Sequence, residues 1–356
     1  MKNKKELKKW LTDFQLPHPL VIAGPCSAET EEQVLTIAHE LKDTDATVLR
    51  AGIWKPRTRP GNFEGVGAIG LKWLQRAKTE TGLLTAIEVA NPTHVELALK
   101  HDIDILWIGA RSAVSPFIVQ EIAEALQGTN KIVLVKNPVN PDLALWLGAV
   151  ERLYASDIKK LGVIHRGFSS YEKTRYRNNP QWQIPIDIQT AFPDLPLLLD
   201  PSHIAGRRDI IFELCQTALD LNYDGFMIEV HHTPDKAWSD AKQQLTPQDF
   251  IKVIKNLTIR KENSKASDYI NKIKLLRTQI EDLDTKIVNT FGERMKVAEK
   301  IGDLKRKNNV TILQSKRWNE IMVRMIAEGK QNNLSEEFMV SVFKAIHHES
   351  INHQKK

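Results

Sequence analysis

Side chains that can bind metals and anions stand at the ends of eight short apolar runs within residues 1–232. The runs extend from PLVIAGPC to DGFMIEVHH, and they lead in turn to Cys26, Arg50, Glu88, Arg111, Lys136, Arg166, His203 and Glu229. Cysteine, histidine and carboxylate side chains are ligands for divalent transition metals. Arginine and lysine bind phosphates and carboxylates through charge-assisted hydrogen bonds. This combination predicts a metal site that handles acidic small molecules.

These residues need a scaffold that gathers eight strand ends in one place. Each run has four to eight residues of β-forming character, and the chain between two runs is long enough for a helix. A strand and a helix repeated eight times, with right-handed crossovers, close into a (β/α)8 TIM barrel, which is an α/β fold. The carboxyl ends of the strands form the catalytic face of such a barrel. Polar residues that merely cap strands would account for only a few of the eight.

Three of the strand-end residues, Cys26, His203 and Glu229, are candidate metal ligands. A fourth ligand is expected from the loop after the last strand, where Asp240 in AWSDAKQQL is the candidate. A mixture of sulfur, nitrogen and oxygen donors suits Mn²⁺, Fe²⁺, Co²⁺ or Zn²⁺ better than Mg²⁺ or Ca²⁺. It also leaves coordination positions open for a substrate, as a catalytic metal requires.

The candidate anion ligands are basic residues around the same face of the barrel: Arg50, Lys55, Arg111, Lys136 and Arg166. Together they can neutralise several phosphate and carboxylate groups. Residues 65–70 spell G-x-G-x-x-G, but they follow the loop KPRTRPGNFEG rather than a strand, so a dinucleotide-binding fold is not expected. These glycines are expected instead to let the loop fold back over the barrel mouth.

Cysteine usage indicates a reducing compartment, and the hydropathy pattern bears on membrane association. The chain is 42% hydrophobic, and its two cysteines, Cys26 and Cys215, make no disulfide framework. No window approaches the roughly 18 apolar residues of a membrane span. Polar residues between the basic start and AGPC leave no apolar core for a signal peptide. We therefore expect a cytoplasmic protein without a membrane partner.

Composition also marks a domain boundary. All 16 prolines lie at or before Pro247, and residues 264–356 hold 18 Lys and Arg against 12 Asp and Glu, whereas charge balances before them. We predict a barrel over residues 1–259, a linker over 260–268 (RKENSKASD) and a helical domain over 269–356. The excess positive charge is scattered, with little aromatic interleaving, so acidic small molecules are better partners than nucleic acid.

Apolar spacing predicts three helices in the second domain. Apolar residues recur at intervals of three and four along about 38 residues, which is typical of one long amphipathic helix. They are Tyr269, Ile273, Leu276, Ile280, Leu283, Ile287, Phe291, Met295, Ala298 and Ile301. Two shorter helices are expected over 314–329 and 335–355, the second opening at a weakly matched capping box that begins with Ser335.

The motifs of the first domain resemble a known family. In order they are GPCS at 24–27, LRAG at 49–52, KPRT at 55–58, GAR at 109–111, KNP at 136–138, HRGF at 165–168, DPSH at 200–203 and IEVH at 228–231. Over about residues 15–260 they resemble 3-deoxy-D-arabino-heptulosonate 7-phosphate (DAHP) synthase, the first enzyme of the shikimate pathway, in its short type I-beta form. The resemblance implies a transferase that condenses phosphoenolpyruvate with erythrose 4-phosphate, and a place in aromatic amino-acid biosynthesis.

The same resemblance implies residue roles. Its metal ligands would be Cys26, His203, Glu229 and Asp240. Its phosphoenolpyruvate ligands would be Arg50, Lys55, Arg111, Lys136 and Arg166, with Arg57 and Thr58 of KPRT on erythrose 4-phosphate. Glu88 and Lys136 lie where protons of the attacking water can be handled. An alternative is the related 3-deoxy-D-manno-octulosonate 8-phosphate synthase, which has an asparagine-containing motif in place of KPRT.

From about Leu275 to Gln354 the second domain resembles an all-helical chorismate mutase, an isomerase that converts chorismate to prephenate. The stretches that carry the likeness are LLRTQIEDLDTKIV, FGERMKVAEKIGDLK, SKRW and HHESINHQ. The resemblance implies that substrate is bound by Arg277, Arg294, Lys305, Arg317, Ser350 and Gln354, with Lys305 and Gln354 on the ether oxygen. Trp318 and Gln314 replace acidic residues common in the family, so affinity and turnover are expected to be modest.

Three interpretations of the second domain remain open: an active mutase, a sensor of chorismate or prephenate that regulates the barrel, and a dimerisation bundle. A helix advances about 100° per residue. Arg294 and Lys305, eleven residues apart, are therefore almost in register, whereas Arg277, 17 residues before Arg294, points about 100° away. A second chain would have to supply the missing arginine. We expect an intertwined homodimer, and allosteric inhibition of the barrel by prephenate or chorismate.

Overall fold

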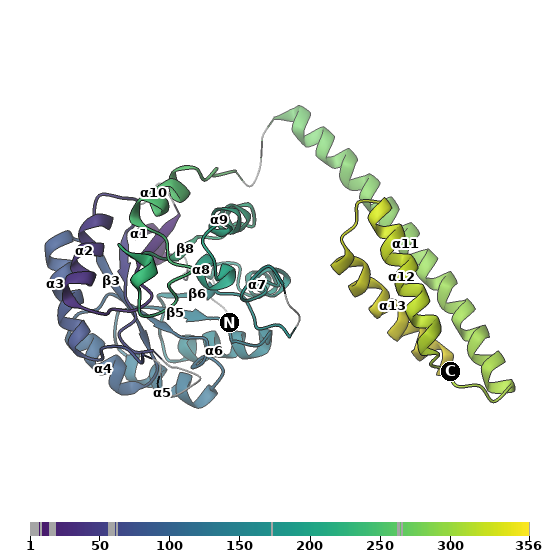
Figure 1. Ribbon diagram of the computed structural model, residues 1–356, viewed down its shortest axis with the longest axis horizontal. Coiled ribbons are helices and arrows are strands. Elements are labelled where there is room, and N and C mark those ends of the chain that lie inside the picture. Colours follow the sequence, from purple (N-terminus) through teal and green to yellow (C-terminus); the bar gives the residue numbers. More distant parts are fainter. Residues whose placement is uncertain are drawn as a thin grey trace. The chain divides into compact units, whose positions relative to one another are not determined.

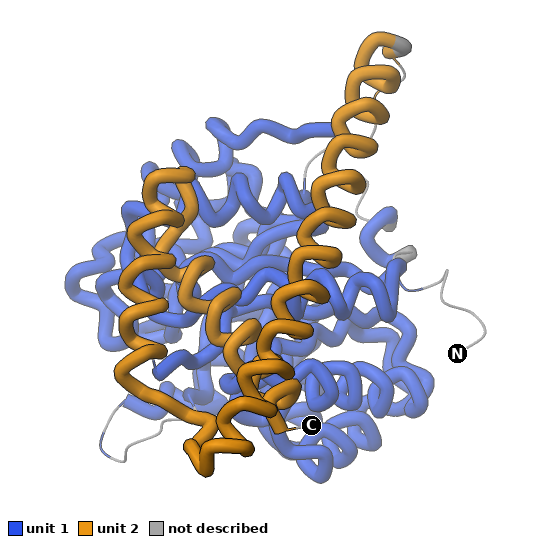
Figure 2. Tube along the Cα trace, turned by 90° about the vertical axis from the view of Figure 1, so that its right-hand side faces the viewer, with its two compact units in different colours: residues 1–262 blue, residues 263–356 orange. Residues whose placement is uncertain are grey.

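The computed structural model describes residues 7, 9–13, 19–55, 61, 63–171, 174–261, 264 and 266–355. The chain divides into two compact units, residues 1–262 and 263–356, which Figure 1 shows as ribbons and Figure 2 in separate colours. Among the residues that the structure describes, no helix is both long enough and apolar enough to cross a membrane.

The first unit is a closed barrel of eight parallel strands in sequence order. Each strand pairs with the next, and β8 pairs with β1. The strands are β1 (Leu20–Gly24), β2 (Val48–Arg50), β3 (Leu84–Val89), β4 (Ile105–Ile108), β5 (Ile132–Lys136), β6 (Leu161–His165), β7 (Leu197–Leu199) and β8 (Gly225–Glu229). The predicted (β/α)8 fold and its eight strands are confirmed.

Helices surround the barrel, and several begin at a side chain that accepts a hydrogen bond from the first turn. Thr30, Asn91, Ser115 and Asp142 cap their helices in this way. The helices are α1 (Lys9–Asp13), α2 (Glu31–Leu41), α3 (Ile69–Thr81), α4 (Pro92–Lys100), α5 (Pro116–Leu126), α6 (Leu143–Ala155), α7 (Gln183–Ala191), α8 (Pro201–Ala205), α9 (Ile211–Asp220), the short η2 (Pro234–Lys236) and α10 (Pro247–Lys255).

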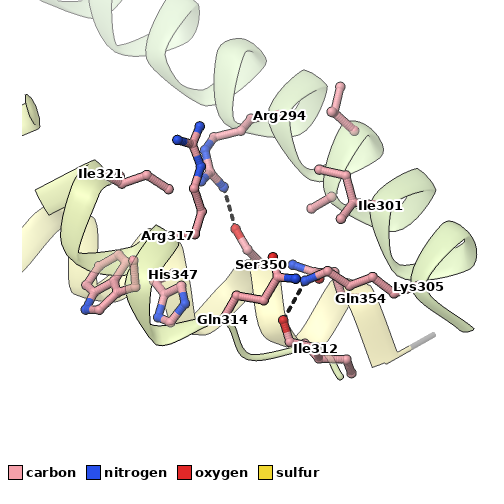
Figure 3. Close-up of a pocket in the computed structure, with 13 residues that line it drawn as sticks. Arg294, Ile301, Lys305, Ile312, Gln314, Arg317, Ile321, His347, Ser350 and Gln354 are labelled. Carbon is pink, nitrogen blue, oxygen red and sulfur yellow. Dashed lines mark hydrogen bonds between the residues drawn. The ribbon is translucent and has the colours of Figure 1, made fainter. Parts of the chain in front are cut away.

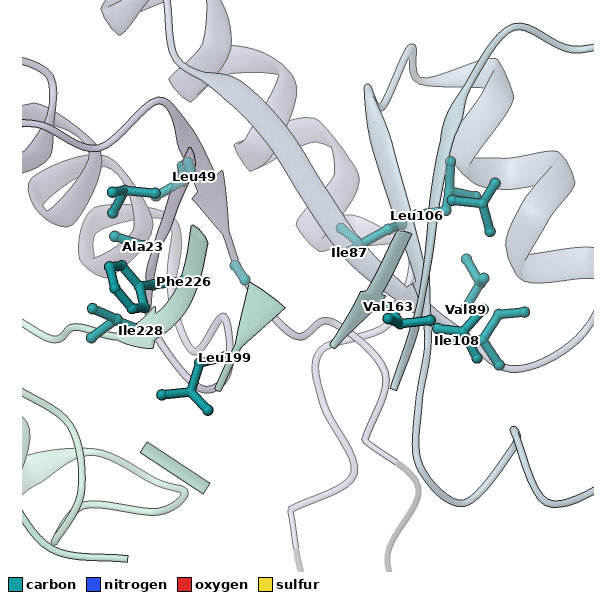
Figure 4. Packing of buried hydrophobic residues seen from close by; sticks show 14 of the residues in the cluster. Ala23, Leu49, Ile87, Val89, Leu106, Ile108, Val163, Leu199, Phe226 and Ile228 are labelled. Atoms are coloured by element: carbon teal, nitrogen blue, oxygen red, sulfur yellow. The ribbon is translucent and has the colours of Figure 1, made fainter. Parts of the chain in front are cut away.

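Alternation along the strands divides the apolar residues into two clusters. Side chains of one parity, such as Leu49, Ile108 and Phe226, pack between the strands and the helices (Figure 4). Side chains of the other parity, such as Val48 and Met227, form a separate cluster. Because neighbouring residues on a strand face opposite ways, this second cluster fills the barrel interior. The polar residues at the ends of β2, β5 and β8 face the same way as this interior cluster.

Trp10 of α1 belongs to the interior cluster and lies at the amino-terminal end of the strands. Its indole Nε1 donates a hydrogen bond of 2.8 Å to the carbonyl of Leu161, the first residue of β6. Gly162 leaves room for the ring, because a Cβ there would lie 3.3 Å from the indole. The basic segment before the barrel thus contributes a helix that covers the end opposite the strand-end residues.

The second unit consists of three helices, α11 (Ser267–Lys307), α12 (Ser315–Gln331) and α13 (Glu336–Lys355). The predicted long helix and its two shorter companions are confirmed, although α11 begins at Ser267, inside the predicted linker. Helix α13 packs against both α11 and α12. Two glycines permit this packing, since a Cβ on Gly302 would lie 2.6 Å from the Gln354 carbonyl oxygen, and one on Gly329 would lie 2.4 Å from the Met339 side chain.

The amino-terminal half of α11 extends beyond the other two helices (Figures 1 and 2). Its apolar residues are exposed: Ile280 is 57% accessible and Leu283 is 55% accessible. Further along the same stripe, Met295 and Ala298 are buried against the bundle. The predicted apolar stripe is therefore continuous, but the residues described here cover only its carboxyl-terminal part.

Candidate functional site

The alternation of side chains along each strand turns several predicted site residues inward at one end of the barrel. Arg50 follows interior Val48 on β2, Lys136 follows interior Leu134 on β5, and Glu229 follows interior Met227 on β8. Each lies two residues after an interior side chain, and each is the last residue of its strand. Period-two alternation therefore turns all three inward at the carboxyl end, where a barrel carries its site.

Three of the four predicted metal ligands lie together. Ligand atoms of Cys26, Glu229 and Asp240 are all within 4.8 Å of one another. Cys26 and Glu229 are buried, and the Cys26 thiol lies 3.3 Å from Asp240 Oδ2. Asp240 lies on the loop after β8, in the left-handed backbone region with a φ of +50°. One sulfur and two carboxylates thus converge from two neighbouring segments of the barrel end.

His203 lies beside this cluster, on the short helix α8. Asp200 caps α8 by accepting a hydrogen bond from the backbone of His203, and its carboxylate also contacts the ring Nδ1 at 3.0 Å. The same Nδ1 is 3.7 Å from Glu229 Oε1. A histidine that donates Nδ1–H to a carboxylate presents Nε2 to a metal. Asp200 therefore fixes the His203 ring next to the ligand cluster, although His203 is not among the three residues whose ligand atoms lie within 4.8 Å of one another.

Charges around the cluster fit a divalent cation. Burial, followed by the neighbouring Glu229, raises the pKa of the Cys26 thiol to about 12. Burial alone would raise the pKa of Asp240, but His203 and Arg177 hold it below its usual value. The buried Oε1 of Glu229 has no hydrogen-bond partner among the described residues. A cation would satisfy that oxygen and favour the thiolate, and the sulfur, nitrogen and oxygen donors suit a transition metal.

Two predicted anion ligands, Arg50 and Lys55, lie directly beside the cluster. Arg50 is 1% exposed, and its Nη2 is 3.4 Å from both the Cys26 carbonyl oxygen and Glu229 Oε1. Its Nε and Nη1 are buried without a hydrogen-bond partner in the described part of the chain. Lys55 Nζ donates to the Cys26 carbonyl at 2.7 Å and lies 3.0 Å from the Cys26 sulfur. Two donors of the buried guanidinium thus remain available to an anion.

Lys136 and Glu88 contact the indole of Trp107, which occupies the barrel interior. The Lys136 ammonium donates to Asp200 Oδ2 at 2.7 Å and lies 5.8 Å from the Trp107 ring centre. The Arg50 guanidinium lies 5.1 Å from the centre of the same ring, so both cations interact with one indole. Trp107 Nε1 donates to Glu88 Oε2 at 3.2 Å. Trp107 therefore supports two predicted anion ligands and orients the predicted proton-handling carboxylate.

Arg166 and Arg111 follow β6 and β4. Arg166 donates to Asn178 Oδ1 at 2.9 Å, and burial, with smaller effects of Arg177 and Arg111, lowers its pKa to about 10. Arg111 is exposed on the turn after β4. The predicted sugar-phosphate ligands, Arg57 and Thr58, lie outside the described residues.

The glycines after the KPRT motif bring the chain back beside β2. Gly65 has a φ of +97°, and a Cβ there would lie 2.1 Å from the Ile53 carbonyl oxygen. Gly67 donates its backbone N–H to the same carbonyl, and the Lys55 N–H is bonded to the Glu64 carbonyl. The loop therefore starts and ends next to Lys55, as a segment that folds back at the barrel mouth must do.

Four residues that the sequence did not mark for a role also belong to this site. They are Trp107, Asp200, Arg177 and Gln243. Asp200 stands within the DPSH motif, so its position was visible although its role was not. Arg177 and Gln243 lie in loops, where arginine and glutamine are common, so no signal in the sequence pointed to them. Arg177 Nη1 donates to Asp240 Oδ1 at 2.8 Å and to Gln243 Oε1 at 2.7 Å.

The helical unit contains a pocket of about 390 Å³ between its three helices (Figure 3). Five of the six residues predicted to bind substrate line it: Arg294, Lys305, Arg317, Ser350 and Gln354. The sixth, Arg277, is exposed on the part of α11 that extends beyond the bundle. No carboxylate is among the described lining residues. The pocket is therefore suited to a ligand with more than one negative charge.

Contacts inside the pocket orient its cations. Arg294 donates to the Ser350 hydroxyl, and burial lowers the pKa of Arg294 (Figure 3). Lys305 donates to the Ile312 carbonyl at 2.6 Å and to Gln354 Oε1 at 3.2 Å. These hydrogen bonds join α11 to α13 and to the turn before α12. Arginine and lysine side chains are thereby directed into one cavity from opposite ends.

One wall of the pocket is aromatic. Trp318 stacks on His347 with ring centres 4.0 Å apart. Gln314 also lines the cavity. Trp318 and Gln314 are the two positions where the sequence departs from the acidic residues of the family that the second domain resembles. Both line the pocket.

Comparisons with known proteins give a family for each of the two units. The DAHP synthetase I family model matches residues 17–265, and the chorismate mutase type II model matches residues 276–355. A phospho-2-dehydro-3-deoxyheptonate aldolase of Thermotoga maritima is 32% identical over 67% of this chain and 68% of its own length. A 2-dehydro-3-deoxyphosphooctonate aldolase of Desulfatibacillum aliphaticivorans is 29% identical over 69% of this chain and 93% of its own length.

Solved structures show the same relation. The crystal structure of the Thermotoga maritima phospho-2-dehydro-3-deoxyheptonate aldolase (DAHP synthase) aligns with a TM-score of 0.61 and 33% identity, over 67% of this chain and 68% of that one. A truncated form of the DAHP synthase from the same organism aligns with a TM-score of 0.59 and 30% identity, over 67% of this chain and 84% of that one. The chain belongs to the DAHP synthetase I family, and a chorismate mutase type II domain follows its barrel.

Proposed function

We propose that the barrel condenses phosphoenolpyruvate with erythrose 4-phosphate at a divalent transition metal, with Mn²⁺ as the first candidate. The observation that carries this proposal is the cluster of Cys26, Glu229 and Asp240 at the carboxyl ends of the strands. His203, held by Asp200, would be the fourth ligand. When bound, the metal would supply a Lewis acid for the aldehyde oxygen of the sugar phosphate.

The protein's own groups would bind and orient the anions. Arg50 offers two buried donors beside the ligand cluster, and Lys136 and Arg166 add positive charge at the same end of the barrel. Neutralising the phosphoenolpyruvate charges lets its C3 approach a second phosphate-bearing molecule. Water adds at C2, phosphate leaves with cleavage of its C–O bond, and Glu88 or Lys136 handles the proton of that water. Arg111, Arg57 and Thr58 complete the set that the sequence predicts.

Removing the metal tests this proposal. EDTA treatment should abolish DAHP formation, and Mn²⁺ should restore it. In Cys26→Ala protein, metal binding and synthase activity should fall together, because a principal ligand is lost. Chorismate turnover by the same sample serves as the control for intact protein. Full synthase activity in EDTA-treated Cys26→Ala protein would exclude the site.

A second candidate for the barrel is condensation with a five-carbon sugar phosphate. It is favoured by the relatives named 2-dehydro-3-deoxyphosphooctonate aldolase, which are 25–29% identical to this chain. The KPRT motif favours the four-carbon sugar. The two are separated by measuring phosphoenolpyruvate consumption with erythrose 4-phosphate and with arabinose 5-phosphate. A higher kcat/KM for arabinose 5-phosphate would overturn the four-carbon assignment.

For the helical unit we propose that the pocket binds chorismate and converts it to prephenate. Arg294 and Arg317 are placed to hold the two carboxylates, while Lys305 and Gln354 form a donor pair for the ether oxygen. This rearrangement needs oriented charge and no nucleophile. An absorbance assay of chorismate loss decides between this proposal and a sensor that binds without turnover.

We also propose that two chains pair through α11. The exposed apolar stripe of its amino-terminal half supports this pairing, because large contiguous apolar surfaces mark interaction sites. Within one chain, Arg277 does not line the pocket. Pairing would bring Arg277 of the second chain toward that pocket. A monomer by light scattering at micromolar concentration would contradict the shared site.

Regulation is proposed to pass from the helical unit to the barrel. A ligand held between two chains fixes their relation and can bias the attached barrels. Prephenate or chorismate should therefore inhibit DAHP formation by the full chain, and a protein that ends at Lys261 should be insensitive. Equal insensitivity of both proteins would refute regulation and leave the two activities in place.

A further inference from the structure

Two consecutive glutamines lie beneath the ligand cluster and are buried completely or almost so. Gln243 is 1% exposed and Gln244 is 0% exposed. They follow Asp240 on the loop after β8, and the next residue, Leu245, forms backbone hydrogen bonds with Glu229 and His231. The loop that supplies Asp240 is therefore fixed to the end of β8 directly after the glutamine pair.

Gln243 joins Glu229 to Asp240 through Arg177. Its Nε2 donates to Glu229 Oε2 at 2.6 Å, and its Oε1 accepts from Arg177 Nη1 at 2.7 Å. The same Arg177 nitrogen donates to Asp240 Oδ1 at 2.8 Å. A guanidinium can only donate, so the amide must turn its oxygen to Arg177 and its nitrogen to the carboxylate. A glutamine meets both requirements, and a glutamate would face Glu229 with a second acceptor.

Gln244 joins the remaining member of the cluster to the same loop. Its Oε1 accepts from the backbone N–H of Cys26 at 2.9 Å, and its Nε2 donates to the carbonyl of Ser239 at 2.8 Å. The hydroxyls of Ser27 and Ser239 form a second link, 2.5 Å long, between the residues that follow Cys26 and precede Asp240. Both ends of the Gln244 amide are thus used to set one ligand segment against another.

We infer that Gln243 and Gln244 are positioning residues that hold Cys26, Glu229 and Asp240 in a geometry ready for a metal. The inference rests on the metal site proposed above. Each of the two carboxylates keeps its other oxygen directed elsewhere: Glu229 Oε1 has no hydrogen-bond partner in the described segments, and Asp240 Oδ2 faces the Cys26 sulfur. Outer hydrogen bonds of this kind set ligand orientation, and their loss typically weakens metal binding about 10- to 100-fold.

Gln243→Met and Gln244→Met test the inference, because methionine keeps the length of the side chain and removes both hydrogen bonds. Gln216→Met is the matched control. Gln216 also joins two segments through both ends of its amide, donating to the Thr258 carbonyl at 3.0 Å and accepting from the Thr258 N–H at 2.9 Å. Full-length protein freed of metal is titrated with Mn²⁺ by calorimetry, below the melting temperature of each variant in EDTA. Binding of Co²⁺ is followed by its thiolate charge-transfer absorption.

Wild-type protein and Gln216→Met should bind about one equivalent of Mn²⁺ with the same Kd, whereas Gln243→Met should bind at least about 10-fold more weakly. Gln244→Met should also lose part of the cobalt–thiolate band, since its amide holds the Cys26 segment. Both variants should also melt at a lower temperature in EDTA, because hydrogen bonds of a buried amide are lost. Kd values within about twofold of wild type in both variants would overturn the inference and leave the metal site intact. A fall in the EDTA melting temperature without weaker Mn²⁺ binding would assign the glutamines to the fold and also overturn it. Wild-type protein that binds no Mn²⁺ would overturn the metal site itself.

Discussion

The barrel and the helical unit both gather cations at one site, but the cations differ in how far they are buried. In the barrel, Arg50 and Lys136 are almost fully buried and stand beside carboxylates of the same chain. In the helical unit, the Arg317 side chain is 61% exposed and pairs with Glu320, one turn away on its own helix. A closed sheet brings eight strand ends together and buries them, whereas the pocket between three helices leaves Arg317 exposed.

This difference determines what a substitution should do. In a buried site, the loss of one charge leaves its partner without compensation in a low-dielectric interior, so binding and stability are coupled. On an open helix face, solvent screens the same change, and the loss falls mainly on ligand binding. Selective substitutions in the two units should therefore separate the two activities.

The largest effect is expected from Arg166→Ala. Arg166 is half-buried beside Asn178, directly after β6, and removal of one oriented cation or donor from such a site typically costs about 10²- to 10³-fold in rate. DAHP formation should fall by that factor while chorismate turnover stays within about twofold. Arg175→Ala, which removes an exposed arginine paired with Glu213, is the matched control. Loss of both activities in folded Arg166→Ala protein would break the two-site description.

The reverse substitution is Lys305→Met in the helical pocket. Lys305 contacts Gln354 and the Ile312 carbonyl and is the cation proposed for the ether oxygen. Chorismate turnover should fall about 10²-fold, and DAHP formation without an effector should be unchanged. Lys300→Met removes an exposed lysine of the same helix and should leave both rates near wild type. A mutase that tolerates Lys305→Met would remove this pocket from the chemistry.

A mixing experiment tests whether the helical site is shared. Arg277→Ala and Arg294→Ala proteins should each be poor mutases, because each lacks an arginine at both sites of a symmetric dimer. After exchange of subunits, about a quarter of all sites should be intact, since one site of every mixed dimer keeps both arginines. No recovery after exchange would place Arg277 outside the site.

The pairing surface has its own control. Ile280→Glu puts a charge into the exposed apolar stripe of α11. Thr278→Glu puts one on the neighbouring polar surface of the same helix, where the Thr278 hydroxyl donates to the Lys274 carbonyl. Only Ile280→Glu should shift the sedimentation of the full chain toward the monomer and lower chorismate turnover. A dimer that tolerates both changes would have another interface.

The sequence sufficed for the barrel because strand parity and strand-end chemistry are local patterns. Apolar runs that end on Arg50, Lys136 and Glu229 predicted both the eight strands and the end of the barrel at which these side chains lie. Spacing also predicted α11, including the near-register of Arg294 and Lys305, which line one pocket. Local periodicity carries this information because it follows directly from the strand and helix repeats.

What the sequence did not reveal depends on contacts between distant loops. Arg177 and Asp240 are 63 residues apart, and Lys136 and Asp200 are 64 residues apart. No local pattern pairs them, and their residue types are common in loops. The same holds for Gln243, because no sequence pattern indicates that its amide contacts the Glu229 carboxylate in the folded chain. Strand-end residues were therefore predictable, and the groups that orient them were not.

The smallest expected effect concerns acid stability and again separates the two units. His165 on β6 is fully buried, with Nε2 2.7 Å from the Pro180 carbonyl oxygen and Nδ1 2.9 Å from the Tyr223 hydroxyl. Burial lowers its pKa to about 3. Between an unfolded value of about 6.5 and this folded value, the unfolded chain binds a proton that the native barrel does not. Barrel stability should therefore decrease as the pH falls, by up to about 1.4 kcal/mol per pH unit from this group.

His165→Gln keeps a donor and an acceptor but does not titrate, so its unfolding free energy should depend on pH less steeply than that of wild type between pH of about 6.5 and about 4.5. Urea unfolding of the full chain, followed through the barrel transition, measures the two slopes. His39→Gln, at an exposed histidine of α2, should leave the slope unchanged. In the helical unit, burial also lowers the pKa of His347, but that ring is only partly covered, so the helical transition should respond less to acid. If the unfolding free energies of wild type and His165→Gln depend on pH with the same slope, the buried histidine does not cause the acid sensitivity of the barrel.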